Sequence, residues 1–195
     1  AFKHANAAGT SPHGGVIALM GDDHTAKSST LAHQSEYAMM DAMIPVLSPA
    51  GVQEFLDLGL HGFSMSRFSG CWTGFKCVTT TVDSSASVYV DPDRIKIILP
   101  DDVTIPADGL NIRWPDSQLE QEVRLHKYKL AAAQAYARSN QIDRIIARGD
   151  HDTLGIVAAG KSYLDTRQAL ADLDLDETDL MRLPLQIMGI WQLLQ

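Results

Sequence analysis

The 195-residue sequence has few cysteines, no long apolar run and no excess of basic residues. Its two cysteines, Cys71 and Cys77, are too few for a disulfide framework or a four-cysteine iron–sulfur cluster, and free thiols are typical of a reducing cytoplasm. No apolar run approaches the roughly 18 residues that span a bilayer, so we expect no membrane association. A net charge of −8 without a basic cluster argues against nucleic-acid binding.

The remaining composition is that of a globular chain, with 45% hydrophobic and 21% charged residues. Two short apolar runs, residues 16–20 and 154–159, each precede a polar turn or a glycine. Such uninterrupted runs predict strands that are buried on both faces, as in parallel sheets. Because helical patterns follow both runs, we predict an α/β fold with a mostly parallel sheet and flanking helices.

Local signals predict the other elements. Ser48 and Pro49 indicate a helix start with Ser48 as N-cap, and the apolar stripe from Val52 to Phe63 marks its buried face. A capping box at residues 117–120 predicts a long helix that ends near residue 140. Further helices are expected at 33–42 and 161–173, and the acidic stretch 172–179 favours another. Strands are expected at 44–47, 71–81, 88–90, 95–99 and 185–194, and turn chemistry at 3–15.

Prolines and glycines divide the chain. Pro100, Pro106, Gly109 and Pro115 mark residues 100–115 as a linker between a first region, 1–99, and a second region, 116–195. The first residue is not methionine, so we expect the chain to be a piece of a longer protein.

One segment matches a phosphate-binding loop letter for letter. Gly155, Gly160, Lys161 and Ser162 have the spacing G-x-x-x-x-G-K-S, which would indicate a nucleoside-triphosphatase. The four middle residues, however, form the apolar run that we interpret as a strand, and N–H groups committed to a sheet cannot also bind phosphate. We therefore favour a strand–glycine–helix turn and keep the nucleotide site as the alternative.

A second polar cluster follows the first predicted strand. It comprises Asp22, Asp23, His24, Lys27, Ser28, Ser29 and His33. Open α/β sheets bind ligands at the carboxyl ends of their strands, which favours a pocket-lining role for this loop. A metal site and a merely solvated loop are the alternatives, and we assign no metal ligands.

Several unusual strings resemble the long indolepyruvate ferredoxin oxidoreductases. They cover most of the chain and lie at residues 2–15, 21–24, 27–30, 33–36, 66–70, 90–94, 109–115 and 160–165. The resemblance implies a thiamine-diphosphate-dependent 2-oxoacid:ferredoxin oxidoreductase. Such enzymes oxidatively decarboxylate aryl pyruvates, transfer electrons through iron–sulfur clusters to ferredoxin, and pass the acyl group to coenzyme A.

The same resemblance implies domain identities. Residues 1–99 are similar to the later part of a pyrimidine-binding-type domain, and residues 116–195 to the start of a transketolase C-terminal-type domain. The implied partners are the rest of the parent polypeptide or a homodimer mate, and the implied location is the cytoplasm.

The departures from the family pattern limit what this chain is expected to do alone. The activating glutamate, the diphosphate–magnesium motif and the cluster cysteines are absent from it. We therefore expect thiamine diphosphate, Mg²⁺ and the clusters to bind elsewhere in the parent, and the piece alone to be inactive. A structural or dimerisation segment with an unpaired sheet edge is a third interpretation.

The resemblance carries over only to the loop after the first strand. It implies that Asp23, His24, Lys27, Ser28, Ser29 and His33 face the cofactor and substrate. Lys27 or a protonated histidine would pair with the substrate carboxylate.

Overall fold

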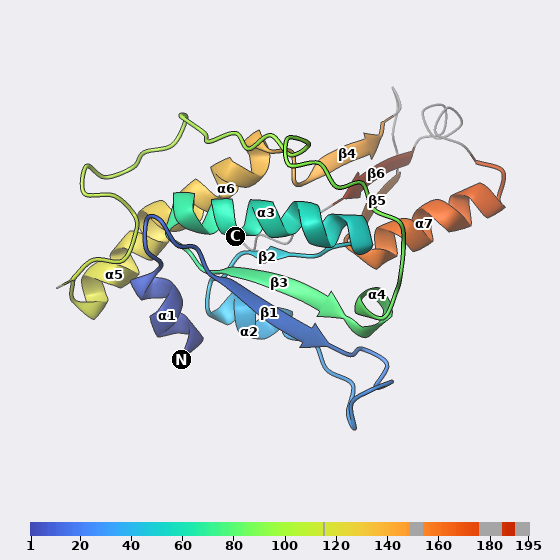
Figure 1. Ribbon diagram of the computed structural model, residues 1–195, viewed down its shortest axis with the longest axis horizontal. Helices are drawn as coiled ribbons and strands as arrows, with labels where there is room; N and C mark the ends of the chain where they lie inside the picture. The colour runs from blue at the N-terminus through green and yellow to red at the C-terminus, as the bar shows by residue number, and fades with distance from the viewer. Residues whose placement is uncertain (115, 149–153, 176–184, 190–195) are drawn as a thin grey trace.

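The computed structural model describes residues 1–114, 116–148, 154–175 and 185–189 (Figure 1). It contains a parallel three-stranded sheet formed by the first half of the chain and a second three-stranded sheet formed by the last third. Helices pack around the first sheet, and a long segment without regular structure, residues 83–114, connects the two halves. The predicted α/β class and the mostly parallel strands are confirmed.

The first sheet has the order β1-β3-β2, so β3 lies in the centre and β1 forms one edge. Its strands are β1 (Ile17–Asp22), β2 (Val46–Leu47) and β3 (Thr73–Val78). β1 pairs with β3 from Ile17 opposite Thr73 to Asp22 opposite Val78, and all pairings are parallel. The carboxyl ends of β1 and β3 therefore meet at the same edge of the sheet.

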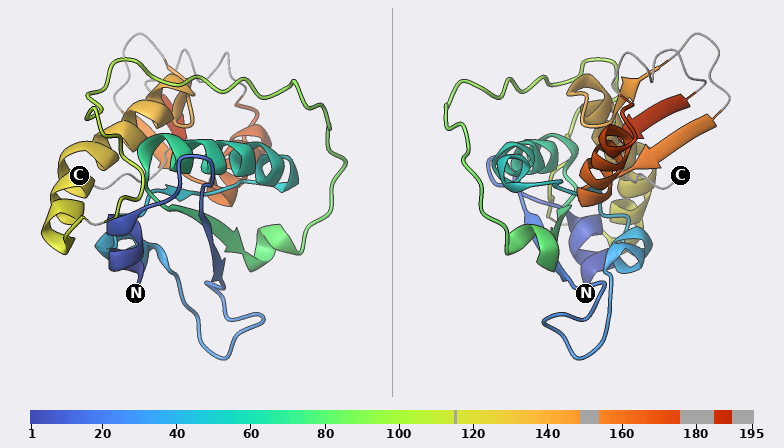
Figure 2. Two further views of the ribbon diagram at one scale, coloured as in Figure 1. Left: turned by 60° about the vertical axis from the view of Figure 1, so that its left-hand side comes forward. Right: turned by 90° about the vertical axis from the view of Figure 1, so that its right-hand side faces the viewer.

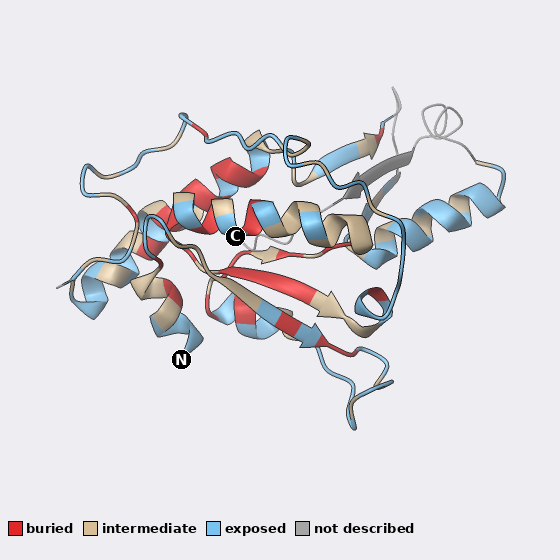
Figure 3. Ribbon diagram, viewed as in Figure 1, coloured by how far each residue is buried: buried red, intermediate tan, exposed pale blue. Residues whose placement is uncertain are grey.

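Helices cover the two faces of this sheet unequally. Helix α3 (Val52–Ser69) lies along one face in Figure 1, where Leu47, Met65 and Phe75 form a core. On the other face α2 (Glu36–Asp41) packs with the strands through Met20 and Met39. Figure 3 shows β3 mostly buried and β1 alternately buried and exposed.

The chain between residues 117 and 140 forms the predicted long helix. It runs through α5 (Gln118–Arg124), a π-helical turn η1 (Leu125–Lys129) and α6 (Leu130–Ser139). Ser117 Oγ accepts from the Glu120 amide and Glu120 accepts from the Ser117 amide, which confirms the capping box. Tyr136 from α6 completes the core under α3, so the helix packs against the first sheet. The three-part domain division stays a prediction.

The second sheet is built from β4 (Arg144–Ala147), β5 (Leu154–Ala158) and β6 (Leu185–Gly189) in the order β4-β6-β5. β5 pairs with β6 in parallel, whereas β4 is antiparallel to it. β5 leads through Gly160 into α7 (Lys161–Asp172), as the strand–glycine–helix interpretation predicts. Ile156 and Val157 pair within the sheet, and this contradicts the phosphate-loop alternative.

Two local predictions were wrong, the turn at residues 3–15 and the helix start at Ser48. Residues 2–8 form a helix, α1 (Phe2–Ala8), and not a turn, because alanines favour helix until Gly9 ends it at φ 95°. Ser48 caps no helix: α3 begins four residues later, and the Glu54 carboxylate accepts from the Ala50 amide. The N-cap of α3 is Gly51, and no side chain caps this helix end.

The burial predicted for the apolar stripe of α3 and for the apolar strand runs was also wrong. Leu56, Leu60 and Phe63 of α3 remain about half exposed, because Met65 and other residues on an adjoining face contact the sheet. β1 and β5 are edge strands and neither is buried on both faces, since Leu19 is 72% and Val157 58% exposed. An exposed edge leaves the dimerisation interpretation open.

No strand forms at residues 88–90 or 95–99, contrary to prediction, and the strand predicted at 71–81 ends at Val78, where α4 (Thr79–Val82) follows. Side chains hold the extended segment in place of a partner strand. The Gln53 amide exchanges hydrogen bonds with the backbone of Tyr89, and the Asn140 amide does the same with Ile98. The predicted last strand is confirmed over residues 185–189, and most of the predicted helix at 172–179 lies outside the described residues.

Candidate functional site

The predicted loop lies at the carboxyl end of β1. Residues 23–35 leave the sheet beyond β1, project away from it, and return into α2 (Figure 2). The two ends of this loop are joined, because Asp23 and His33 form an isolated antiparallel bridge. The position agrees with the rule that open α/β sheets bind ligands beyond the carboxyl ends of their strands.

Asp23 organises the loop from the inside. Its buried carboxylate accepts hydrogen bonds from the amides of Lys27 (3.0 Å), Ser28 (2.6 Å) and Ser29 (2.9 Å), and from Ser28 Oγ (3.1 Å). Ala26, at φ 51°, turns the chain so that these amides converge. The Ser28 amide, with the Lys27 and Ser29 amides, holds the pKa of Asp23 well below its usual range. These amides are therefore not available to an external anion.

His33 closes the base of the loop. Its Nε2 lies 2.9 Å from the Gly21 carbonyl oxygen and its Nδ1 lies 3.3 Å from the Leu31 carbonyl oxygen. The Gly21 carbonyl, followed by the Leu31 carbonyl, stabilises the protonated ring and raises the pKa of His33. His33 is thus held by the backbone at the base of the loop.

A second group of charged side chains lies beside the loop. The ligand atoms of Asp22, His24 and Glu36 all lie within 4.8 Å of one another, and His24 Nε2 is 4.0 Å from Asp22 Oδ2. The Asp22 side chain is fully buried and accepts from the amide (3.1 Å) and hydroxyl (2.6 Å) of Ser35. Lys76 from the central strand pairs with Glu36 Oε1, while Glu36 Oε2 is buried and lacks a hydrogen-bond partner.

This group has the donor types that bind a divalent cation, two carboxylates and one imidazole. The ammonium of Lys76 already neutralises one of the two carboxylates, which weakens attraction for a cation. The group can equally hold a polar substrate, with Lys76 and His24 as donors and Asp22 as acceptor.

The predicted site residues therefore separate into two groups. Asp23, Ser28 and Ser29 meet one another inside the loop, whereas the side chains of His24 and Lys27 face solvent. Among the described residues the Lys27 ammonium makes no ion pair. Lys27 and His24 are consequently the loop side chains best placed to meet a ligand.

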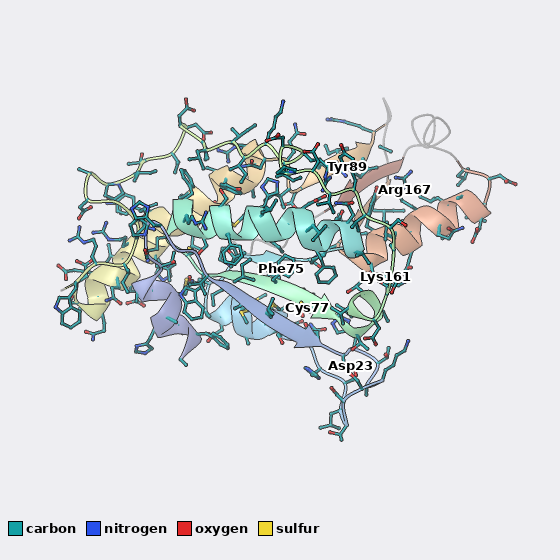
Figure 4. The ribbon with its side chains drawn as sticks, in the orientation of Figure 1. Asp23, Phe75, Cys77, Tyr89, Lys161 and Arg167 are labelled. Atoms are coloured by element: carbon teal, nitrogen blue, oxygen red, sulfur yellow. The ribbon has the colours of Figure 1, made fainter. Side chains whose placement is uncertain are left out.

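Sequence reasoning missed Glu36 and Lys76. Lys76 lies among apolar residues in β3, where alternation places it on the face opposite Phe75. Glu36 is the first residue of α2, 40 positions earlier in the chain. Figure 4 shows Asp23 at the root of the loop and Cys77, the residue after Lys76, near the end of β3. Only the parallel pairing of β1 and β3 brings these parts together.

Comparisons with known proteins match both halves of the chain. The family described as "Indolepyruvate ferredoxin oxidoreductase middle domain" matches residues 143–193. Indolepyruvate oxidoreductase subunit IorA of Pyrococcus abyssi (strain GE5 / Orsay) is 26% identical over 179 residues, which cover 88% of this chain and 26% of that protein. The same subunit of Archaeoglobus fulgidus is 26% identical over 172 residues, 84% of this chain and 26% of that protein. No solved structure matches.

These matches support a relation to the indolepyruvate ferredoxin oxidoreductase family. The family match covers the second sheet, and the IorA matches cover more than four fifths of the chain, so that the likeness extends into its first half. The predicted resemblance is confirmed to that extent. The chain spans about a quarter of the length of these IorA relatives.

Neither cysteine is suited to bind a metal cluster. Cys71 is fully buried, and this burial raises the pKa of its thiol to about 11. Burial, together with the charge of Asp22, also raises the pKa of the Cys77 thiol. Two cysteines are in any case too few for a cluster that is held by four cysteine thiolates. In the described part of the chain no helix is long and apolar enough to cross a bilayer.

Proposed function

We propose that this chain is a part of a thiamine-diphosphate-dependent 2-oxoacid:ferredoxin oxidoreductase of the indolepyruvate type. The likeness to IorA, which covers more than four fifths of the chain, is the observation that carries the proposal. In the complete enzyme an aryl 2-oxoacid is oxidatively decarboxylated, the acyl group goes to coenzyme A and two electrons go to ferredoxin. The chain alone is inactive, because it supplies only part of the site.

The role of this chain is to present the loop at residues 23–35 to the substrate. Asp23 fixes the loop from within, so that Lys27 and His24 are displayed at the carboxyl end of the sheet. The Lys27 ammonium binds the substrate carboxylate as a point charge, and His24 donates a hydrogen bond to the substrate. Asp22, fully buried beneath His24, keeps that imidazole oriented.

The cofactors of the complete enzyme bind outside this chain. When bound, thiamine diphosphate supplies the carbanion that attacks the keto carbon, and iron–sulfur clusters accept the electrons. The two cysteines do not fit a cluster, and the amides that could have bound a diphosphate are occupied by Asp23. We therefore assign to this chain the substrate-facing loop and no cofactor ligands.

Replacing Lys27 by alanine in the complete enzyme should raise KM for the 2-oxoacid about tenfold and change kcat less than twofold. The reason is that a charge-assisted contact to the carboxylate of the bound 2-oxoacid is lost, which weakens binding, whereas the steps after CO₂ has left no longer contain that carboxylate. Steady-state kinetics at saturating coenzyme A measure both constants.

Lys96→Ala is the matched control, since Lys96 is also exposed but lies in the connecting segment, far along the chain from the loop. Its kinetic constants should equal those of the wild type. An unchanged KM in Lys27→Ala, or an equal rise in both variants, would reject the assignment of Lys27.

A further inference from the structure

Three side chains beside the loop lie around one point. The carboxylates of Asp22 and Glu36 and the imidazole of His24 each offer one ligand atom, and these atoms all lie within 4.8 Å of one another. In proteins a Zn²⁺ ion lies about 2.0–2.2 Å from its nitrogen and oxygen ligands. A small movement of the side chains would therefore let one ion contact all three.

The fold holds both carboxylates in place. The Asp22 side chain is fully buried, its Oδ1 accepts from the Ser35 hydroxyl (2.6 Å) and its Oδ2 accepts from the Ser35 amide (3.1 Å). Glu36 begins α2, and its Oε1 pairs with the Lys76 ammonium. Donors of this kind orient the carboxylates that bind metal ions in other proteins, and each carboxylate oxygen keeps a further lone pair. Binding an ion would need little rearrangement of Asp22 and Glu36.

The second oxygen of Glu36 points to a ligand. Glu36 Oε2 is buried, and among the described residues it has no hydrogen-bond partner. A buried charged oxygen without a partner is unfavourable, and such atoms are normally satisfied by a donor or by a cation. An ion placed between Glu36, Asp22 and His24 would satisfy Oε2 while Lys76 keeps Oε1.

His24 is the exposed member of this group and indicates the kind of ion. Its side chain is 40% exposed, and its Nε2 lies 4.0 Å from Asp22 Oδ2. Mg²⁺ and Ca²⁺ prefer oxygen ligands alone, whereas Zn²⁺ and Co²⁺ bind an imidazole nitrogen together with carboxylates. The donor set therefore favours a transition-metal ion.

We infer that Asp22, His24 and Glu36 bind a divalent transition-metal ion, best fitted by Zn²⁺ with water at its fourth position. The Lys76 ammonium weakens the attraction but does not occupy Oε2, so we expect micromolar binding and not the tighter binding of closed zinc sites. This ion is neither the Mg²⁺ of thiamine diphosphate nor a cofactor of the proposed reaction. Zinc and the 2-oxoacid would compete for His24, and this consequence alone rests on the proposed function.

Titration calorimetry of the metal-free 195-residue chain with zinc chloride tests the inference. One Zn²⁺ should bind per chain with a Kd of about 1–10 µM. Co²⁺ should bind at the same place and give a visible ligand-field absorption that Zn²⁺ then abolishes. Mg²⁺ in about hundredfold excess should not displace Co²⁺, because it binds imidazole poorly.

Variants locate the ion. His24→Ala changes an exposed side chain and should weaken Zn²⁺ about tenfold or more, and Glu36→Gln should do the same. His126→Ala is the matched control, since His126 is also exposed but lies in η1, and it should bind Zn²⁺ like the wild type. If Glu36→Gln does not fold without its pair to Lys76, His24→Ala decides.

Four results would overturn the inference: no saturable binding of Zn²⁺, displacement of Co²⁺ by Mg²⁺, wild-type affinity in His24→Ala or in folded Glu36→Gln, or an equal loss in His126→Ala. Each measurement follows the metal and none follows oxidation of a 2-oxoacid. Failure of the metal site would therefore leave the proposed function to its own test.

Discussion

Replacing Gly70 by alanine is expected to lower the free energy of unfolding by about 3–4 kcal/mol. Gly70 ends α3 in the left-handed conformation, at φ 73°, and its amide donates to the Ser66 carbonyl. A β-carbon there would lie 2.1 Å from the carbonyl oxygen of Leu110 and 2.7 Å from its carbonyl carbon. Because both are backbone atoms of a buried residue, no side-chain rotation relieves the clash. The segment around Leu110 would have to leave the core.

Gly59→Ala is the matched control, in the same helix. Nothing lies within 4 Å of a β-carbon at Gly59, so alanine should raise stability by about 0.5–1 kcal/mol through its higher helix propensity. Urea unfolding followed by circular dichroism measures both changes. A Gly70→Ala protein as stable as the wild type would show that Leu110 does not pack against the end of α3.

Replacing Asn6 by alanine should cost about 3–4 kcal/mol of stability. The Asn6 side chain is completely buried and makes three hydrogen bonds to backbone groups. Its Nδ2 donates to the carbonyls of Ala42 (2.9 Å) and Met43 (2.7 Å), and its Oδ1 accepts from the Trp72 amide (2.9 Å). Alanine would leave these groups without partners where water does not reach easily, and α1 would lose its side-chain hydrogen bonds to the segments that lead into β2 and β3.

Asn111→Ala provides the comparison, because Asn111 also donates from Nδ2 to a backbone carbonyl, that of Arg67 (3.0 Å), but at the surface. Water can replace that bond, so the loss should be about 0.5–1 kcal/mol. The two variants should differ by about 2–3 kcal/mol in urea unfolding. Equal losses of stability in the two variants would show that burial does not raise the cost of removing the Asn6 hydrogen bonds.

Local signals in the sequence predicted the elements that depend on local interactions. The capping box at Ser117 and Glu120 is satisfied within four residues, and both apolar runs become strands. The strand–glycine–helix turn at Gly160 followed from the same reasoning, because Ile156 and Val157 could not serve a sheet and a phosphate at once. These features need no knowledge of the tertiary fold.

The wrong predictions at residues 2–8 and at Ser48 misread local signals, whereas the others depended on distant contacts. The segment at residues 88–99 has the composition of strands, but Gln53 and Asn140 hold its backbone in place of a neighbouring strand. The charged group beside the loop forms only because β1 and β3 pair, which places Lys76 near Glu36. The sequence located the loop but did not indicate that the Asp23 carboxylate would occupy its amides.

The most direct test of the proposed function uses the complete protein that contains this chain. Reduction of a one-electron acceptor is followed with an aryl 2-oxoacid, coenzyme A, Mg²⁺ and thiamine diphosphate. We expect reduction that requires both the 2-oxoacid and thiamine diphosphate, with formation of one acyl-coenzyme A for every two electrons transferred. A folded, cofactor-loaded protein that oxidises neither aryl nor branched 2-oxoacids would contradict the proposed function.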